Sequence, residues 1–365
     1  MTHPLTLYVL VGLGSCGLTV LLVPLCRWLA LTLDVVDRPS EARKVHGRVV
    51  PYLGGLPFYV SFLAAVLVIE LFFPRYSQPV FYPLCLVGTL IVMMGLYDDV
   101  CDMSSLKKLL IELALASLLF FWGFKTTEIA SPFGGTFNAG WLAIIIMPLW
   151  VAGVINAVNF SDGLDGLAGG LVFICAASIF AIAFRNGQVV SCILMAYLMG
   201  TTLGYLKYNF YPASVFMGDA GSLFLGFVLG AATLVEHQKG LAVIALAVPM
   251  VVMAVPIIDT LLSFYRRMLR ARQGEFFMPD RDHLHHRLLD LGLTQVQAVL
   301  ALYYISVCMG LMAFVLSVVP TAYTFLILVL AGMAILFGVA VLRFIEGLSQ
   351  ARALEKRSDP PPSQP

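Results

Sequence analysis

The sequence predicts an all-α, polytopic integral membrane protein with about eleven transmembrane helices. Hydrophobic residues make up 60% of the 365 positions and charged residues only 12%, whereas about a quarter of an ordinary soluble domain is charged. Apolar runs recur along the chain, each with roughly the 20 residues that a helix needs to cross a hydrocarbon core of about 30 Å. The predicted spans are residues 5–31, 49–73, 80–97, 109–124, 141–158, 167–184, 189–206, 222–235, 241–263, 296–319 and 321–342.

These spans form one predicted membrane domain, residues 1–345, which a short tail, residues 346–365, follows. The first apolar run is longer than the hydrophobic part of a cleaved signal peptide and has no basic segment before it, so we expect a retained helix. The tail ends in Ser-Asp-Pro-Pro-Pro-Ser-Gln-Pro. Because proline removes backbone donors and the tail has few apolar side chains, we expect it to be disordered.

Lysine and arginine are unevenly distributed between alternate loops, which predicts the orientation of the chain in the membrane. One set of loops contains only Arg75, Lys125, Arg185 and Lys239, while the other set and the C-terminal tail are rich in basic residues. The positive-inside rule places the basic set in the cytoplasm. The N-terminus is then outside and the C-terminus cytoplasmic, which agrees with an odd number of spans.

Three aspartates in the predicted cytoplasmic loops are candidates for a metal site. Asp98 and Asp99 directly follow the span 80–97, and Asp219 precedes the short span 222–235. Adjacent carboxylates repel one another unless a cation or a basic group offsets their charge. Mg²⁺ prefers carboxylate oxygens and is often held by one or two of them together with substrate phosphates. The alternatives are a solvated acidic pair at a helix end for Asp98 and Asp99, and a helix N-cap for Asp219.

The most specific polar motif is Asn-Ala-Val-Asn-Phe-Ser-Asp-Gly-Leu-Asp-Gly at residues 156–166. Asn156, Asn159, Asp162 and Asp165 recur every three residues, so on a roughly helical path they would share one face. No lysine or arginine lies within the motif to pair with the aspartates. Because ionisable groups at a membrane boundary are costly, such a face usually lines a cavity or binds a ligand. An N-cap role of Asp162 for the helix from residue 167 would explain only one of the four side chains.

A histidine cluster lies in the longest predicted cytoplasmic loop, in the segment Arg-Asp-His-Leu-His-His-Arg at residues 281–287. Zinc is one candidate ligand, but no cysteine accompanies the histidines, and adjacent positions on a helix point in different directions. Phosphate oxygens suit a basic histidine cluster at least as well. The residues concerned are Arg281, His283, His285 and His286.

Several basic residues lie at the predicted depth of the lipid headgroups. Lys44 and His46 precede a Pro-Tyr-Leu-Gly-Gly turn that leads into the second span, and Lys107 and Lys108 follow the aspartate pair. A lysine at this depth can extend to the headgroups or contact anionic lipid, which is the interpretation that we favour for Lys107. For Lys44 and Lys108, binding of a lipid-linked phosphate fits equally well.

Taken in order along nearly the whole chain, these motifs resemble the polyprenyl-phosphate N-acetylhexosamine 1-phosphate transferases, a membrane superfamily. The matching segments are Lys-Val-His with the downstream Pro-x-x-Gly-Gly, the Asp-Asp pair, the asparagine and aspartate motif, Phe-Met-Gly-Asp-Ala-Gly-Ser and His-Leu-His-His. The chain is more similar to the bacterial undecaprenyl-phosphate N-acetylglucosamine 1-phosphate transferase branch than to the muramoyl-pentapeptide branch. Leu284 interrupts a histidine run that is usually contiguous in the latter branch, and Asp102 stands where that branch tends to carry lysine.

The resemblance implies that undecaprenyl phosphate attacks the β-phosphorus of a UDP-sugar, with UDP-N-acetylglucosamine the best match, to give an undecaprenyl-diphospho-sugar and UMP. The reaction would require Mg²⁺, with Mn²⁺ as an alternative, and would start a lipid-linked envelope glycan at the cytoplasmic face of the bacterial inner membrane. A single displacement and a route through a phospho-aspartyl enzyme both fit it. The implied partners are the UDP-sugar, the lipid phosphate and membrane lipid, without nucleic acid; a homodimer is compatible with the family.

The resemblance also implies roles for individual residues. Asp219 resembles the family's principal Mg²⁺ ligand, and Asp98 and Asp99 resemble its catalytic pair, with Asp98 the candidate for activating the acceptor phosphate. The implied nucleotide site consists of Asn156, Asn159, Asp162, Asp165 and Phe216, whose ring would stack on uracil. The diphosphate or sugar would be bound by Arg281, His283, His285 and His286, and the lipid phosphate by Lys44, His46 and Lys108.

Two other functions stay open at this point. A phospho-N-acetylmuramoyl-pentapeptide transferase, or a member using another UDP-N-acetylhexosamine, would share these motifs. A transporter or flippase for lipid-linked sugars would be a different class of protein. Against a transporter, the predicted acids gather at one face, and the spans 80–97, 189–206 and 296–319 carry no charge at mid-membrane.

Overall fold

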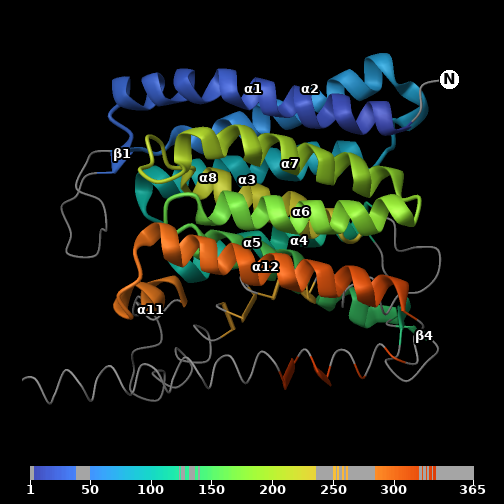
Figure 1. Cartoon of the computed structure of the whole chain (residues 1–365). Helices are drawn as coiled ribbons and strands as arrows, with labels where there is room; N and C mark the ends of the chain where they lie inside the picture. The colour runs from blue at the N-terminus through green and yellow to red at the C-terminus, as the bar shows by residue number, and fades with distance from the viewer. Residues whose placement is uncertain are drawn as a thin grey trace, which may run out of the picture.

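The computed structural model describes residues 4–37, 50–122, 124, 128–130, 136–138, 140–235, 250–251, 253–254, 257–258, 260–261, 284–319, 323, 326, 329–330 and 332–333. These residues are almost entirely helical, and the long helices lie side by side in one bundle (Figure 1). The strands are short and form two antiparallel pairs. β1 (Val36–Asp37) pairs with β2 (Val50–Pro51), and β3 (Glu128–Ala130) pairs with β4 (Thr136–Asn138). The prediction of an all-α membrane fold is confirmed, apart from these hairpins.

The helices follow the apolar runs of the sequence closely. Within the described residues, seven helical segments are long and apolar enough to cross a membrane. The predicted spans 241–263 and 321–342 lie mostly outside the described residues, so the count of eleven and the orientation stay predictions. The helices are α1 (Pro4–Thr32), η1 (Leu53–Gly55), α2 (Leu56–Phe72), η2 (Pro74–Tyr76), α3 (Phe81–Cys101), α4 (Ser105–Phe121), η3 (Gly140–Leu142), α5 (Ala143–Ser161), α6 (Leu167–Arg185), α7 (Val189–Asn209), α8 (Gly218–Ala232), α11 (Leu284–Asp290) and α12 (Gln295–Val318).

Two helices continue past the hydrophobic runs that predicted them. α3 continues to Cys101, so Asp98 and Asp99 lie within its last turn, and α8 begins at Gly218, so Asp219 lies in its first turn. Hydropathy places the ends of these helices at the first charged side chain, although a helix can continue when that side chain finds partners within the protein. These aspartates find such partners, as described below.

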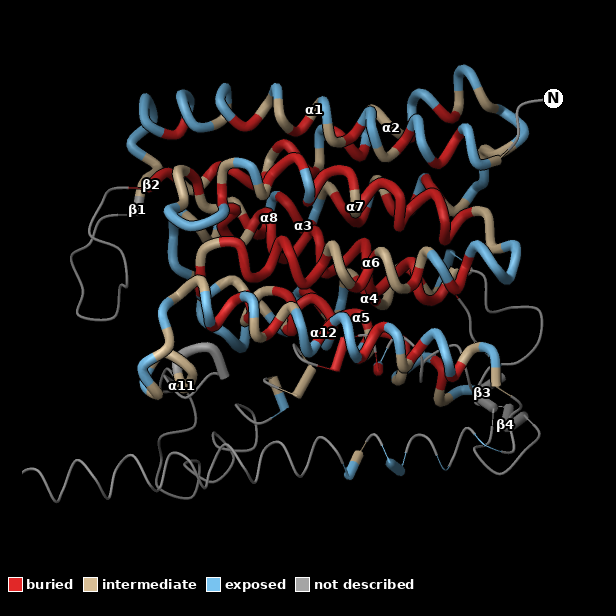
Figure 2. Tube along the Cα trace, viewed as in Figure 1, coloured by how far each residue is buried: buried red, intermediate tan, exposed pale blue. Residues whose placement is uncertain are grey.

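α8 lies at the centre of the bundle. Every residue of this 15-residue helix except Asp219 is buried, and α8 packs between α3 and α5. The approach of α3 is very close, because a Cβ built on Gly95 would lie 2.4 Å from the Cα of Ala220. The helix is about 22 Å long at 1.5 Å per residue, too short for a bilayer core, but protein surrounds it. Figure 2 shows the buried residues concentrated on α6, α7 and α8.

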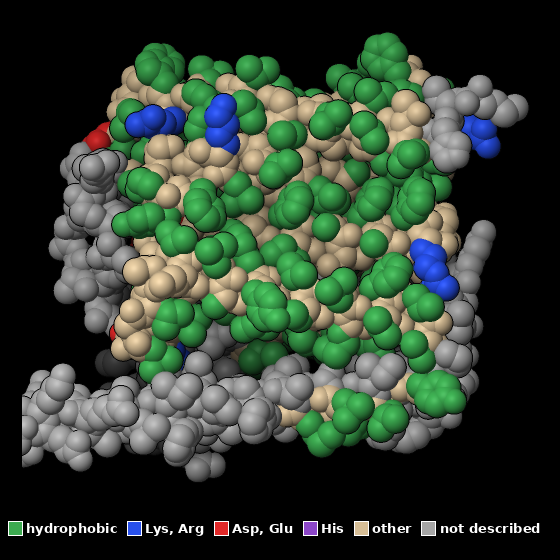
Figure 3. Space-filling view, in the orientation of Figure 1, with side chains coloured by type: hydrophobic (Ala, Val, Ile, Leu, Met, Phe, Trp, Pro, Cys, Tyr) green, Lys and Arg blue, Asp and Glu red, His purple; other side chains and the backbone are tan. Residues whose placement is uncertain are grey.

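The outer helices present hydrophobic side chains to their surroundings. α1 exposes large apolar residues such as Leu13 and Leu21, while its inner face packs on α7 and forms a buried hydrogen bond between Thr19 and Thr201 at 2.8 Å. Figure 3 shows hydrophobic side chains spread across the middle of one face of the molecule, with the few lysine and arginine side chains towards its two ends. This distribution is the one expected of a surface in contact with lipid.

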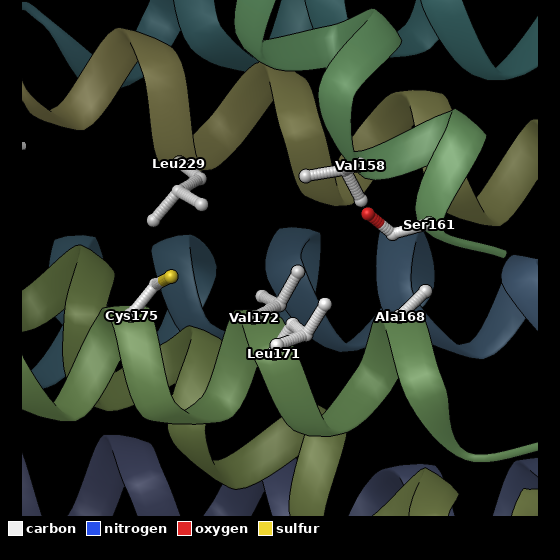
Figure 4. A pocket seen from close by; sticks show the side chains of 7 residues that line it. All are labelled: Val158, Ser161, Ala168, Leu171, Val172, Cys175 and Leu229. Carbon is white, nitrogen blue, oxygen red and sulfur yellow. The ribbon is translucent and has the colours of Figure 1, made fainter. Parts of the chain in front are cut away.

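The bundle has two distinct ends. β1 and α11 lie at one end, whereas the N-terminus and the β3–β4 hairpin lie at the other (Figures 1 and 2). The short connections from α3 to α4, from α5 to α6 and from α7 to α8 lie at the same end as α11, because successive long helices are antiparallel. A small apolar cavity lies deeper between α5, α6 and α8 (Figure 4), and its walls are Val158, Ser161, Ala168, Leu171, Val172, Cys175 and Leu229.

Candidate active site

Lys108 and two aspartates form the centre of a polar cluster at the α11 end of the bundle. Lys108 Nζ lies 2.9 Å from Asp98 Oδ2 and 2.5 Å from Asp219 Oδ2, so one ammonium group joins α3, α4 and α8. The side chains of Lys108, Asp98 and Asp219 are only 12%, 8% and 28% exposed. The ammonium group offsets the repulsion between the two carboxylates. Lys107 is exposed, whereas Lys108 faces the protein interior, which does not fit simple contact with lipid headgroups.

Asp99 is bound to the start of α8. Its Oδ1 accepts a hydrogen bond from the Asp219 N–H at 2.7 Å, and its Oδ2 accepts one from the Ala220 N–H at 3.2 Å. The first N–H groups of a helix lack partners within the helix and carry partial positive charge, so a carboxylate stabilises them. Gly218, with φ of 66°, permits this approach, because a Cβ there would lie 2.5 Å from Asp99 Oδ2. The solvated acidic pair and the N-cap role of Asp219 are therefore both wrong.

Replacing Asp99 by alanine is expected to loosen the first turn of α8. Loss of two hydrogen bonds to the helix start should lower the free energy of unfolding by about 2 kcal/mol. The Asp99→Asn variant would keep one acceptor oxygen, so its loss should be smaller. Unfolding of the purified protein in detergent measures both values. Asp290→Ala, at an exposed position, is the control, and an equal loss in that variant would contradict the assignment.

Asn156 and Asn159 lie on one face of α5, as their spacing predicts. The Nδ2 group of Asn159 donates to Asp219 Oδ1 at 2.5 Å and to Ser222 Oγ at 2.9 Å, both on α8. Asn156, almost one turn earlier, donates to Glu112 Oε2 on α4. α5 thus contributes Asn159, which contacts Asp219 directly, and Asn156, which contacts Glu112 on the neighbouring helix α4.

Glu112 belongs to none of the polar motifs that predict the site. It lies in the predicted span 109–124 and is fully buried in the structure. A signal was nevertheless present, because a carboxyl inside an apolar span is unusual, and this one follows Lys108 by four residues and therefore shares its helix face.

Asp162 and Asp165 do not continue the face of α5, because that helix ends at Ser161 and both aspartates lie in the turn before α6. Asp165 Oδ2 accepts a hydrogen bond from the Ala213 N–H at 2.8 Å. The N-cap of α6 is Gly166, with φ of 80° and no side-chain cap. The alternative of an N-cap role for Asp162 is therefore wrong, as is the expectation of a single helical face for all four residues.

Several carboxyl groups lie close together around this turn. Burial, together with the charges of Asp219, Asp99 and Asp165, raises the pKa of Asp162 to about 8. Burial is the largest cause of this shift, and the neighbouring carboxylates add to it because like charges disfavour ionisation. This end of the bundle is therefore electrostatically suited to a cation.

Phe216 lies three residues before Asp219 and connects that segment to the chain around β2. The Phe216 N–H donates to the Pro51 carbonyl at 2.9 Å, and the Gly54 N–H donates to the Phe216 carbonyl at 3.0 Å. The rings of Phe216 and Tyr52 lie 6.3 Å apart at 49°. The structure thus brings the Pro-Tyr-Leu-Gly-Gly turn to the start of α8, while stacking of Phe216 on uracil stays a prediction.

Other predicted site residues are not placed by the described part of the chain. Lys44, His46, Arg281 and His283 lie outside the described residues. His285 and His286 belong to α11, which packs on α12 at the same end of the bundle as the aspartates. Their predicted roles with phosphate or sugar therefore stay predictions.

The donor set of the cluster fits a magnesium ion held by few protein ligands. Among the described residues, no three His, Cys, Asp or Glu side chains converge as a preformed metal centre. Asp98 and Asp219 do converge, on Lys108, whereas Asp99 gives both oxygens to backbone N–H groups. Mg²⁺ is commonly bound through one or two carboxylates, waters and substrate phosphates. Asp98 and Asp219 therefore suit the ion better than Asp99 does.

Comparison with known proteins gives a consistent result. The model of glycosyl transferase family 4 matches residues 81–237, which run from α3 to just beyond α8. The probable undecaprenyl-phosphate N-acetylglucosaminyl 1-phosphate transferase of Bacillus subtilis is 35% identical over 302 residues, 82% of either chain. The decaprenyl-phosphate N-acetylglucosaminephosphotransferase of Mycolicibacterium smegmatis is 34% identical over 338 residues, 85% of this chain and 82% of that protein.

A third relative is the undecaprenyl-phosphate alpha-N-acetylglucosaminyl 1-phosphate transferase of Escherichia coli K12, which is 29% identical over 295 residues, 77% of this chain and 76% of that protein. The predicted resemblance is confirmed by these matches. The region that matches the family model contains Asp98, Lys108, Asn159 and Asp219, which the structure brings together. The chain belongs to glycosyl transferase family 4.

Proposed function

We propose that this chain transfers N-acetylglucosamine 1-phosphate from UDP-N-acetylglucosamine to undecaprenyl phosphate and releases UMP at the cytoplasmic face of the bacterial inner membrane. The observation that carries the proposal is the convergence of Asp98, Lys108 and Asp219 at one end of a membrane bundle. The names of the Bacillus subtilis and Escherichia coli relatives support the sugar and the polyprenyl phosphate. The excess of lysine and arginine in the loops that the sequence predicts on this side supports a cytoplasmic orientation.

The proposed reaction forms one phosphorus–oxygen bond and breaks another. An oxygen of the lipid phosphate attacks the β-phosphorus of the UDP-sugar, and the bond from that phosphorus to the bridging oxygen breaks. UMP leaves with the electron pair of that bond. Phosphoryl transfer depends mainly on positioning and on neutralisation of charge. A site that combines a fixed ammonium group with carboxylates able to hold a cation meets both needs.

The residues of the cluster have separate tasks in this proposal. Asp219 and Asp98 would hold Mg²⁺, which when bound supplies charge neutralisation at the diphosphate. Lys108 keeps a positive charge beside the two carboxylates. Asp98 would also take a proton from the acceptor phosphate, the role that the family resemblance implies for it. Asp99 positions Asp219 through its backbone N–H, and Asn159 orients the Asp219 carboxylate.

The alternative substrates and protein classes receive less support. The three relatives are named for N-acetylglucosamine transfer and none for a muramoyl-pentapeptide. A transporter needs a polar path between the two faces of the membrane, whereas the described carboxylate cluster lies at one end of the bundle and a buried apolar helix, α8, extends away from it.

The decisive experiment measures UMP release by the purified protein in detergent or bilayers. We expect UMP from UDP-N-acetylglucosamine only when undecaprenyl phosphate and Mg²⁺ are both present, because the acceptor is the nucleophile and the carboxylates need a cation to bind a diphosphate. Parallel reactions with UDP-N-acetylgalactosamine and UDP-N-acetylmuramoyl-pentapeptide test the sugar. Absence of UMP from UDP-N-acetylglucosamine, with release from another donor, would reassign the substrate.

A further inference from the structure

Glu112 is a buried carboxyl within the apolar part of α4, one helical turn beyond Lys108. Its side chain is fully buried, Oε2 accepts a hydrogen bond from Asn156, and Oε1 has no hydrogen-bond partner among the described residues. An ionisable group at this depth is costly, and an unpartnered buried oxygen adds to that cost. Stability alone therefore does not explain a glutamate at this position.

The contacts with Glu112 and with the Ala152 carbonyl together determine the orientation of the Asn156 amide. Asn156 Nδ2 donates to Glu112 Oε2 and to the Ala152 carbonyl, the latter at 2.9 Å, so both amide hydrogens are used within the protein. A carboxylate accepts hydrogen bonds and cannot donate them, so a flipped amide would place its oxygen against another oxygen. Within the part of the chain that the structure describes, no group donates to the Asn156 carbonyl oxygen, so this atom can accept a hydrogen bond from a ligand.

α4 and α5 contribute to the cluster at two successive levels. Lys108 and Asn159 belong to the outer level, where both contact Asp219. Glu112 and Asn156 are bonded to each other at the inner level, four residues along α4 from Lys108 and three residues along α5 from Asn159. Because these spacings place side chains on a common helix face, the bonded pair of Glu112 and Asn156 lies directly beneath Lys108 and Asn159.

We infer that Glu112 is a positioning residue that fixes Asn156 as a hydrogen-bond acceptor for the nucleotide sugar. The inference rests on the proposed function and extends it to the recognition of one substrate, the nucleotide sugar. A nucleotide sugar offers hydroxyl and N–H donors, whereas an ionised lipid phosphate offers only acceptors. Asn156, held in this orientation, discriminates in favour of the sugar donor and contributes nothing to acceptor binding.

The test separates donor from acceptor kinetics in variants of the full-length protein. Glu112→Leu removes the hydrogen bond and should raise the KM for UDP-N-acetylglucosamine about fivefold to tenfold, the effect of one hydrogen bond. The KM for undecaprenyl phosphate should stay within about twofold. Glu112→Gln should restore the donor KM, because its amide oxygen can still accept from Asn156. Calorimetric binding of UDP-N-acetylglucosamine provides a second readout that does not need turnover.

A double variant and a control test whether Glu112 affects the donor KM through Asn156. Asn156→Ala should raise the donor KM at least as much as Glu112→Leu, and adding Glu112→Leu to it should change nothing further, because Glu112 acts through Asn156. Glu70→Leu is the matched control, since Glu70 on α2 accepts from Ser77 near the opposite end of the bundle. That variant should keep the wild-type donor KM. Glu112→Met replaces the leucine variant if the latter does not fold.

Each alternative outcome has a defined meaning. An active Glu112→Leu protein with the wild-type donor KM would overturn the inference alone, as would additive effects in the double variant. Failure of Glu112→Gln to restore the donor KM would also overturn it, because the charge of Glu112 rather than its hydrogen bond would then matter. A wild-type protein that neither binds nor consumes UDP-N-acetylglucosamine would overturn both this inference and the proposed function.

Discussion

Replacing Asp219 by asparagine is expected to lower the turnover number on the order of 10³-fold, the scale seen when one preorganised electrostatic group is removed from an active site. Asp219 contacts Lys108 through Oδ2 and Asn159 through Oδ1, and it is the more exposed of the two carboxylates that converge there. Asparagine keeps the shape of the side chain and removes its charge. The variant should therefore fold and lose the capacity to hold a cation beside the diphosphate.

Steady-state UMP release over a range of Mg²⁺ concentrations measures this loss. The half-saturating Mg²⁺ concentration should rise in Asp219→Asn, because one charged ligand is gone. Asp290→Asn, at an exposed position on α11, serves as the control and should behave as the wild type. Normal activity of Asp219→Asn at every Mg²⁺ concentration would show that the metal site has been assigned to the wrong residue.

Replacing Lys108 by methionine should cost about 3 kcal/mol of unfolding free energy in the absence of Mg²⁺ and should also abolish transfer. The ammonium group lies between two poorly exposed carboxylates, and removal of one partner from a buried ionic cluster leaves uncompensated charge. Added Mg²⁺ should recover much of the lost stability, because a cation that binds only the folded protein stabilises it by mass action. Thermal unfolding with and without Mg²⁺ measures both effects.

Lys107→Met is the matched control for this prediction. Lys107 precedes Lys108 directly and is exposed, so its replacement should change the free energy of unfolding by no more than about 0.5 kcal/mol. If Lys108→Met were as stable as Lys107→Met without Mg²⁺, the ion pairs with Asp98 and Asp219 would contribute nothing. If Mg²⁺ stabilised Lys108→Met no more than Lys107→Met, the ion would not compensate for the positive charge lost between Asp98 and Asp219.

The membrane helices could be predicted from the sequence because the requirement for about 20 apolar residues per span is a local property of the chain. Their polar ends could not be predicted in the same way. Asp99 belongs to α3 and Asp219 to α8 because each contacts the other's segment, a contact between residues 120 positions apart. Hydropathy treats each aspartate as the place where a helix stops, and cannot foresee that tertiary packing supplies a partner.

The candidate site shows the same division between pattern and packing. The asparagine motif predicted that Asn156 and Asn159 would share a face, since a spacing of three is a helical property. It did not predict that the helix would end before Asp162. The turn that follows is bonded to the end of α7, because Asn209 Oδ1 accepts a hydrogen bond from the Gly166 N–H at 3.0 Å. Glu112 was missed because its apolar neighbours dominate the average hydropathy of that span.

Because α8 lies at the centre of the bundle, a change in bilayer thickness should affect it less than it affects the outer helices. A bilayer that does not match a helix in length makes that helix tilt or deforms the lipid around it. This effect acts on helices with lipid-facing surfaces, such as α1, and α8 has no such surface because all its residues except Asp219 are buried. We therefore expect α8, and with it the position of Asp219, to respond less to bilayer thickness than α3 and α4, which carry Asp98 and Lys108 and expose apolar side chains.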